Sequence, residues 1–121
     1  MNDFDAVAAA YLDACNATDP GRRERLLGEV FAPDVSYIDP MAAVDGHEGM
    51  GAFIAGVHER FPGWTFRQVG EADGHHDQAR FRWSLGPEGE EPPVLGFDVV
   101  ELDAEGRIKT VRGFLDRVPG A

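Results

Sequence analysis

The feature that most constrains the fold of this chain is a change in the spacing of its apolar residues near residue 63. Before this point apolar residues mostly recur every three or four positions, as on one face of a helix. After it they alternate, as on one face of a strand. Helices followed by a run of strands are typical of an α+β domain. We therefore expect helices that cover one face of a strongly curved, mostly antiparallel sheet.

Three helices are expected in the first half of the chain. Residues 3–17 carry an apolar stripe of helical spacing. A second, shorter helix begins at the pair Asp19-Pro20, which is a cap and first-turn signal, and ends before the next proline. A third helix carries apolar residues at helical spacing from residue 50 onward. It stops at Pro62-Gly63.

Alternating segments predict the strands. One lies between the second and third expected helices, at residues 34–39. Four more cover residues 64–73, 78–85, 94–102 and 107–118. These four are joined by a turn that contains Gly74, a Pro- and Gly-rich loop at 86–93 and the turn DAEG at 103–106, so consecutive strands are expected to pair antiparallel. A chain of 121 residues has room for one core, and we expect residues 1–121 to form a single domain. A bent sheet wrapped over helices leaves an interior suited to a small molecule.

The charge balance excludes several classes of partner. The chain has 22 acidic and 11 basic residues, a formal net charge of −11, and no run of Lys or Arg. Such a surface repels nucleic acid and anionic lipid, so we expect neither as a partner. The N-terminus lacks the pattern of a signal peptide, no segment has membrane-spanning length, and the expected location is cytoplasmic. The single cysteine, Cys15, fits a small buried residue of the first helix.

The segment 94–102, VLGFDVVEL, places Asp98 in the middle of an otherwise apolar strand. Burying an ionised carboxylate without a partner costs several kcal/mol, so the group either finds donors or stays protonated. Two explanations are equally open from spacing alone. In the first, Asp98 has a structural role: it lies at a sheet edge or pairs with an arginine such as Arg80, Arg82 or Arg112. In the second, Asp98 serves a functional site.

Several short motifs resemble those of one protein superfamily. They are YLDACNATD at 11–19, FAPDV at 31–35, YIDP at 37–40 and the glycine at position 46. Together they resemble the nuclear transport factor 2-like superfamily and, within it, the SnoaL-like polyketide cyclases and ketosteroid isomerases. The resemblance covers nearly the whole chain. It implies a cone of three helices packed on a curved mixed sheet, and a homodimer formed through the open sheet face.

The resemblance also implies a catalytic site. Ketosteroid isomerases carry a tyrosine on the first helix, an aspartate at the end of the first strand and an aspartate on a later strand. By local motif these fall on Tyr11, Asp39 and Asp98. One aspartate of that enzyme moves a proton, while the tyrosine and a protonated aspartate bind the developing oxyanion. The implied roles are base for Asp39 and donors for Tyr11 and Asp98, acting without a cofactor on an apolar, carbonyl-bearing ligand such as a steroid or polyketide.

Simpler roles stay open for these residues. Asp39 precedes Pro40 and suits a turn, and Tyr11 suits the core. The chain also departs from the isomerases. It has Phe53-Ile54 where they place a second pocket tyrosine, and its insertion PGRRERLL between Tyr11 and Asp39 is longer. The coincidence of all three residue types favours a functional site.

The remaining aromatic and apolar candidates are expected to line the ligand site. They are Tyr37, Phe53, Val57, Phe81, Trp83 and Phe114. The histidines match no metal-binding spacing, so we expect no metal, and His75-His76 suits a hairpin turn. Two other classes of function stay open: a module that binds an apolar ligand without chemistry, and a protein-interaction domain that uses the sheet.

Overall fold

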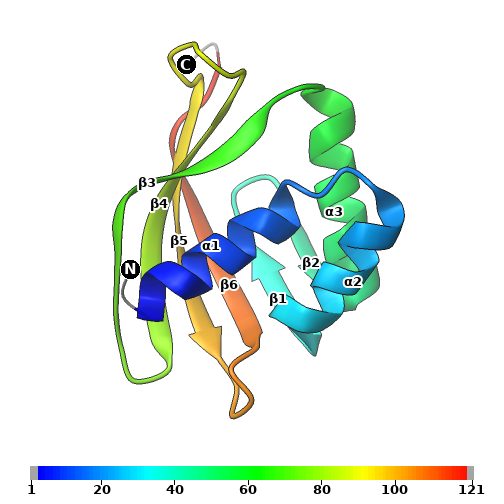
Figure 1. Ribbon diagram of the computed structural model, residues 1–121, viewed down its shortest axis with the longest axis vertical. Helices are drawn as coiled ribbons and strands as arrows, with labels where there is room; N and C mark the ends of the chain where they lie inside the picture. The colour runs from blue at the N-terminus through cyan, green and yellow to red at the C-terminus, as the bar shows by residue number, and fades with distance from the viewer. Residues whose placement is uncertain (1–2, 120–121) are drawn as a thin grey trace.

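Helices lead and most strands follow along the chain, as the apolar spacing predicts (Figure 1). The computed structural model describes residues 3–119. Its helices are α1 (Asp3–Cys15), α2 (Pro20–Val30) and α3 (Gly46–Arg60). Its strands are β1 (Phe31–Ile38), β2 (Ala43–Asp45), β3 (Thr65–His75), β4 (Gln78–Gly86), β5 (Val94–Leu102) and β6 (Ile108–Arg117).

The strands form one mixed sheet in the order β2-β1-β6-β5-β4-β3. Strands β3 to β6 form an antiparallel meander, which confirms the pairing expected from the turns that join them. Strand β1 pairs with β6 in parallel. The expectation of an α+β domain with three helices on a curved, mostly antiparallel sheet is confirmed.

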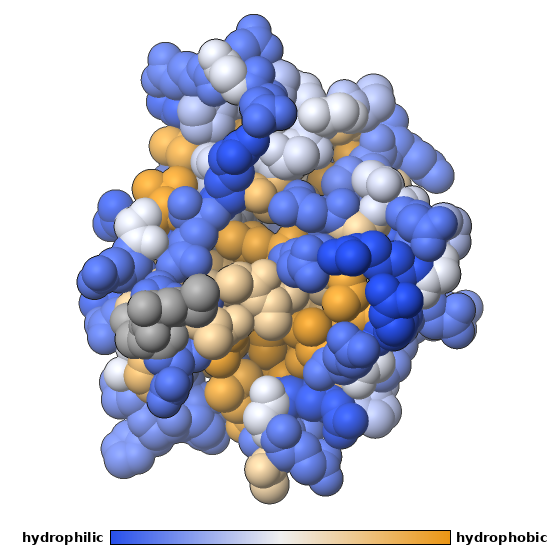
Figure 2. Space-filling view, in the orientation of Figure 1, coloured by the Kyte–Doolittle hydropathy of each residue, from blue (hydrophilic) through white to orange (hydrophobic). Residues whose placement is uncertain are grey.

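The helices cover one face of the sheet, called the inner face below. Helix α1 crosses β3 and β4, and α3 packs against β1 (Figure 1). Apolar surface gathers in the middle of this view, and hydrophilic side chains surround it (Figure 2). Within residues 3–119, no helix is both long and apolar enough to cross a membrane.

Helix α2 begins where the sequence predicts, because Asp19 caps it. The Asp19 side chain accepts a hydrogen bond of 2.8 Å from the backbone N–H of Arg22, and Pro20 occupies the first turn. Helix α3 follows Asp45, whose side chain makes no such hydrogen bond.

The first strand differs from its predicted bounds. It begins at Phe31 rather than at residue 34 and runs through Pro33. The pairing of β1 with β6 shifts register between Phe31 and Ser36. Pro33 lies exposed in this irregular stretch. A proline is tolerated there because no backbone N–H of residue 33 is needed for the hydrogen bonds between the two strands. The three-residue strand β2 was not predicted, since it is too short to show an alternating pattern.

Strand β4 shows which residues reach each face. Phe81 and Trp83 are buried on the inner face, while Arg80 and Arg82 are exposed on the outer face, as their alternation predicts. The turn between β3 and β4 contains His76, whose φ of 52° lies in the left-handed region. The hairpin turn expected at His75-His76 is therefore confirmed.

Candidate active site

Asp98 lies on the inner face of β5, and its side chain is 1% exposed. In the sheet it pairs with Phe81 of β4 and Gly113 of β6, so it is not at an edge. Its Oδ1 atom is buried without a hydrogen-bond partner. A carboxyl group of this kind needs an explanation other than a surface salt bridge.

The arginines proposed as partners lie elsewhere. Arg80 donates to Asp73 at 3.2 Å, and Arg112 donates to the backbone carbonyl of Ser36 at 3.1 Å. Both side chains, like that of Arg82, belong to outer-face positions of their strands. The arginine-paired and edge-strand explanations for Asp98 are therefore wrong.

Burial changes the protonation of Asp98. Desolvation raises the pKa of this carboxyl from 3.8 to about 7. The side chains of Trp83 and Tyr11 face the carboxyl and lower its pKa in part, and the nearby charge of Asp39 raises it. Near neutral pH a large fraction of Asp98 is consequently protonated and able to donate a hydrogen bond.

Asp39 follows the end of β1 and has a different environment. Its Oδ1 atom accepts hydrogen bonds of 2.8 Å from the backbone N–H groups of Met41 and Ala42. Its Oδ2 atom accepts a hydrogen bond of 2.5 Å from the Tyr37 hydroxyl. Asp39 therefore does hold the turn after β1. The same three donors also fix the direction of its half-buried carboxylate.

Gly113 allows the two aspartates to approach each other. A Cβ atom built on Gly113 would lie 2.7 Å from Asp98 Oδ1 and 3.2 Å from Asp39 Cβ. Any side chain here would displace one of the two residues. The sequence reading missed Gly113, although an isolated glycine inside a strand is a known signal of close approach.

Tyr11 of α1 contributes a neutral hydroxyl to this cluster. Its ring is buried against Phe31 and Phe81, with centroid distances of 5.9 Å and 5.4 Å. Burial raises the pKa of the hydroxyl well above its usual value, and the charge of Asp98 raises it further. Burial likewise raises the pKa of the neighbouring Cys15 thiol, which fits a buried structural role for Cys15.

Five of the six expected ligand-site residues belong to the inner side of the sheet or to the helix facing it. The rings of Tyr37 and Phe53 pack with centroids 4.5 Å apart. Phe81 and Trp83 are buried inner-face residues, and Val57 of α3 packs partly buried against the core.

Phe114 is the exception, and its expected place in the cavity wall is wrong. Its side chain is 52% exposed on the outer face, where its ring stacks on Phe97 with centroids 5.2 Å apart. Because β6 alternates and Gly113 occupies the inner position, the next residue points outward.

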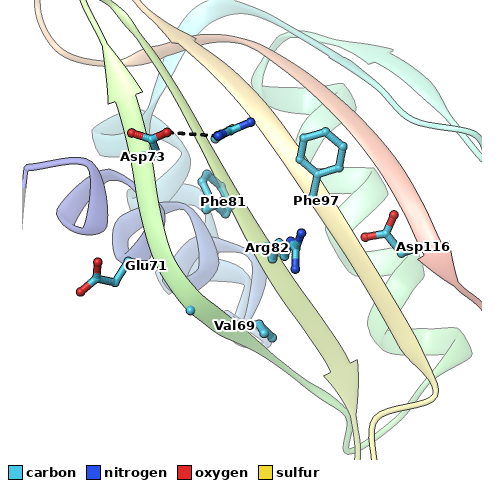
Figure 3. A pocket seen from close by; sticks show the side chains of 9 residues that line it. Val69, Glu71, Asp73, Phe81, Arg82, Phe97 and Asp116 are labelled. Carbon is cyan, nitrogen blue, oxygen red and sulfur yellow. Dashed lines mark hydrogen bonds and ion pairs between the residues drawn. The ribbon is translucent and has the colours of Figure 1, made fainter.

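Two surface clefts lie apart from this cluster. A cleft of about 470 Å³ on the outer face is lined by Val69, Asp73, Arg80, Arg82, Phe97 and Asp116, among others (Figure 3). Of the expected ligand-site residues, Phe81 also borders this cleft. A second, of about 410 Å³, lies between α2 and α3. Neither is lined by Tyr11, Asp39 or Asp98. The outer cleft is lined largely by charged side chains, unlike the mostly apolar lining of small-molecule sites.

Two histidines serve the fold. His47 Nε2 lies 2.9 Å from the carbonyl oxygen of Phe31, and His58 Nε2 lies 2.7 Å from that of Cys15. In the described part of the chain, no three His, Cys, Asp or Glu side chains gather closely enough to hold a metal ion.

Comparisons with known proteins agree on one group. A family model described as the SnoaL-like domain matches residues 8–111. A protein of Agrobacterium tumefaciens, described as a candidate isomerase of the SnoaL-like family, is 40% identical. The match covers 92% of this chain and 95% of that chain, with a TM-score of 0.88. No curated protein matches the chain significantly.

More distant structures share the fold. A candidate polyketide cyclase of Sinorhizobium meliloti has a TM-score of 0.70 at 19% identity, over 89% of this chain and 93% of that one. A SnoaL-like protein of unknown function from Burkholderia thailandensis has a TM-score of 0.73 at 14% identity, over 95% and 97%.

Proposed function

Because the chain belongs to the SnoaL-like domain family, we propose that it is a small enzyme that transfers a proton on an apolar, carbonyl-bearing ligand. The proposed ligand is of steroid or polyketide type, and the reaction is an isomerisation or a cyclisation without a cofactor. The descriptions of two relatives, one as a candidate isomerase and one as a candidate polyketide cyclase, support this choice.

The observation that carries the proposal is the placement of two unlike carboxyl groups on either side of Gly113. Asp98 is buried among apolar side chains with its pKa raised to about 7. Asp39 accepts three hydrogen bonds, an arrangement that suits an ionised carboxylate. Acid–base catalysis near neutral pH uses neighbouring groups whose environments separate their protonation states.

The roles follow from these environments. The Asp39 carboxylate removes a proton from the carbon next to the ligand carbonyl, and the electron pair of that C–H bond moves toward the carbonyl oxygen. The negative charge that develops on the oxygen is stabilised by hydrogen bonds from neutral Tyr11 and protonated Asp98. Protonated Asp39 then returns the proton to a different carbon of the same ligand, which completes an isomerisation.

The proposal can be tested without knowing the natural ligand. We expect the wild-type protein to speed the exchange of α-hydrogens for deuterium in a panel of apolar ketones and enones in D2O, measured by NMR. Asp39→Asn should slow this exchange about 100-fold or more, the usual contribution of a general base. Asp98→Leu should also abolish it while the fold stays intact.

Asp116→Asn is the matched control, since Asp116 lies in the outer cleft and should leave the exchange unchanged. Exchange by Asp39→Asn at the wild-type rate would contradict the proposal. Binding of a ketone without any exchange would favour a second candidate, a non-catalytic ligand-binding or dimerisation module. The stacking of half-buried Phe97 on exposed Phe114 at the outer face of the sheet is the observation that favours dimerisation.

A further inference from the structure

Among residues 3–119, two polar side-chain atoms on the inner face are buried without a hydrogen-bond partner. They are Nε1 of Trp83 and Oδ1 of Asp98. The Trp83 side chain is 8% exposed, and the Asp98 side chain is 1% exposed. An unpaired buried polar group costs about 1–3 kcal/mol, and native proteins leave few of them. Two on adjacent strands suggest that something absent from the free chain pairs with them.

The sheet register brings these two side chains together. Trp83 pairs with Gly96, which is the inner-face position next to Asp98 on β5. A Cβ atom on Gly96 would overlap the six-membered part of the indole, so glycine at this position gives the ring its space. The indole is also held from the other side by Phe66, at a centroid distance of 5.4 Å in an edge-to-face arrangement.

The indole N–H lies near the Asp98 carboxyl but makes no hydrogen bond with it. Trp83 favours the charged form of Asp98, which places its N–H near the carboxyl oxygens. The contact nevertheless falls short of hydrogen-bond geometry, since Nε1 has no partner. A single oxygen atom between the two groups would satisfy both of them if Asp98 is protonated, because each would then be a donor.

We infer that the Trp83 indole N–H binds the carbonyl oxygen of the ligand, beside the Asp98 carboxyl. This inference rests on the proposed function and specifies how that site recognises its ligand. An indole N–H can only donate a hydrogen bond, so the bound oxygen must accept, as carbonyl and phenolate oxygens do. Because Phe66 and Gly96 hold the ring in place, the donor is oriented before the ligand arrives, which is what stabilises an oxyanion effectively.

The test compares two ligands and two tryptophan variants. The ligands are 2-naphthol, whose oxygen imitates the oxyanion, and naphthalene, which has the same rings without oxygen. Trp83→Phe should weaken naphthol binding about tenfold or more, equivalent to about 1.4 kcal/mol, and leave naphthalene binding nearly unchanged. The matched control is Trp64→Phe, because Trp64 is the other tryptophan of the chain and stacks on Phe61 instead. It should change neither affinity.

A second readout reports the N–H itself. In the 15N-labelled wild-type protein, naphthol should shift the indole N–H resonance of Trp83 downfield, while naphthalene should not. Equal loss of both affinities in Trp83→Phe would indicate a packing role and overturn the inference, as would an unshifted resonance. If Trp83→Phe does not fold, benzothienylalanine at position 83 in the Trp64→Phe background removes the N–H and keeps the ring shape.

The outcome separates this inference from the proposed function. If ketone exchange occurs but Trp83→Phe binds naphthol like the wild type, Trp83 has no recognition role and the enzyme proposal stands. If Trp83→Phe loses naphthol selectively while no ketone undergoes exchange, the recognition role stands and the enzyme proposal fails. Absence of naphthol binding to the wild type overturns the inference directly.

Discussion

At the scale of single residues, a buried acid without an ionic partner makes stability depend on pH. The pKa of Asp98 is about 7 in the folded chain, against an ordinary value of 3.8. Between these values the folded state holds a proton that the unfolded state releases, so stability falls as pH rises from about 4 to about 7. The loss is at most about 1.4 kcal/mol per pH unit. Below about pH 4 and above about pH 7, Asp98 causes no further change in the free energy of unfolding with pH.

Asp98→Asn should therefore remove this dependence, because an amide does not ionise. Relative to the wild type, the variant should gain stability steadily from about pH 4 to pH 7, and the gain should then stay constant. Urea unfolding at several pH values measures the difference between the two proteins. Asp116→Asn, on the exposed outer face, should follow the wild-type curve. A difference between Asp98→Asn and wild type that is the same at every pH would contradict the assignment.

The sequence indicated Asp98 because its neighbours along the strand are apolar, and motif resemblance added Tyr11 and Asp39. The structure brings these three into one cluster. The prediction for Phe114 was wrong for a physical reason. Its apolar ring suggested that it points to the inner face, but neighbouring residues of a strand point to opposite faces, so an error of one position changes the face. The inner position belongs to Gly113, since the two aspartates need the space.

At the scale of secondary structure elements, strand β6 depends on that glycine. Gly113→Ala should destabilise the fold by about 1–3 kcal/mol, because the new methyl group would overlap the Asp98 carboxyl. It should also slow ketone exchange by displacing the Asp98 carboxyl. Chemical denaturation and the exchange assay measure the two effects.

Gly28→Ala is the matched control for this substitution. Gly28 lies inside α2, and a Cβ atom there would meet nothing within 4 Å. Replacing a glycine by alanine inside a helix should stabilise the folded chain by about 0.5–1 kcal/mol. If both variants had the same stability as the wild type, close packing around Gly113 would be refuted.

Local patterns predicted the elements better than their pairing. The bounds of β5 were predicted to the residue, because its apolar run is long and ends at clear turns. The parallel pairing of β1 with β6 could not be read from spacing, since the partners lie about 75 residues apart and parallel strands need no local turn signal. Pro33 was read as a boundary, but an irregular stretch of β1 accommodates it.

At the scale of the whole molecule, the helices leave the outer face of the sheet open (Figure 1). This face carries the stacked rings of Phe97 and Phe114, together with Val69 and Ile38, which are 42% and 45% exposed. Contiguous apolar patches on the surface of a protein often mark sites of protein–protein contact. The nearby cleft contains both Arg82 and Asp116 (Figure 3).

A face that carries both an apolar centre and charges of opposite sign can bind a copy of itself. In a two-fold symmetric contact each patch meets the same patch, so an arginine of one protomer can lie against an aspartate of the other. The chain has a net charge of −11, which makes two copies repel, and the apolar contact must outweigh that repulsion. We therefore expect a homodimer through the outer sheet face.

Phe114→Glu should convert this dimer to a monomer, because it places a carboxylate at the centre of an apolar contact. Size-exclusion chromatography with light scattering over a range of concentrations measures the change. Met41→Glu is the control: Met41 is 67% exposed in the turn after β1 and is not part of a strand, and the dimer should persist. Arg82→Glu should weaken the dimer, and adding Asp116→Arg in the same chain should restore part of it if the two residues meet across the axis. A wild-type chain that remains monomeric at high micromolar concentration would contradict the prediction and leave the outer aromatic pair without a dimer role.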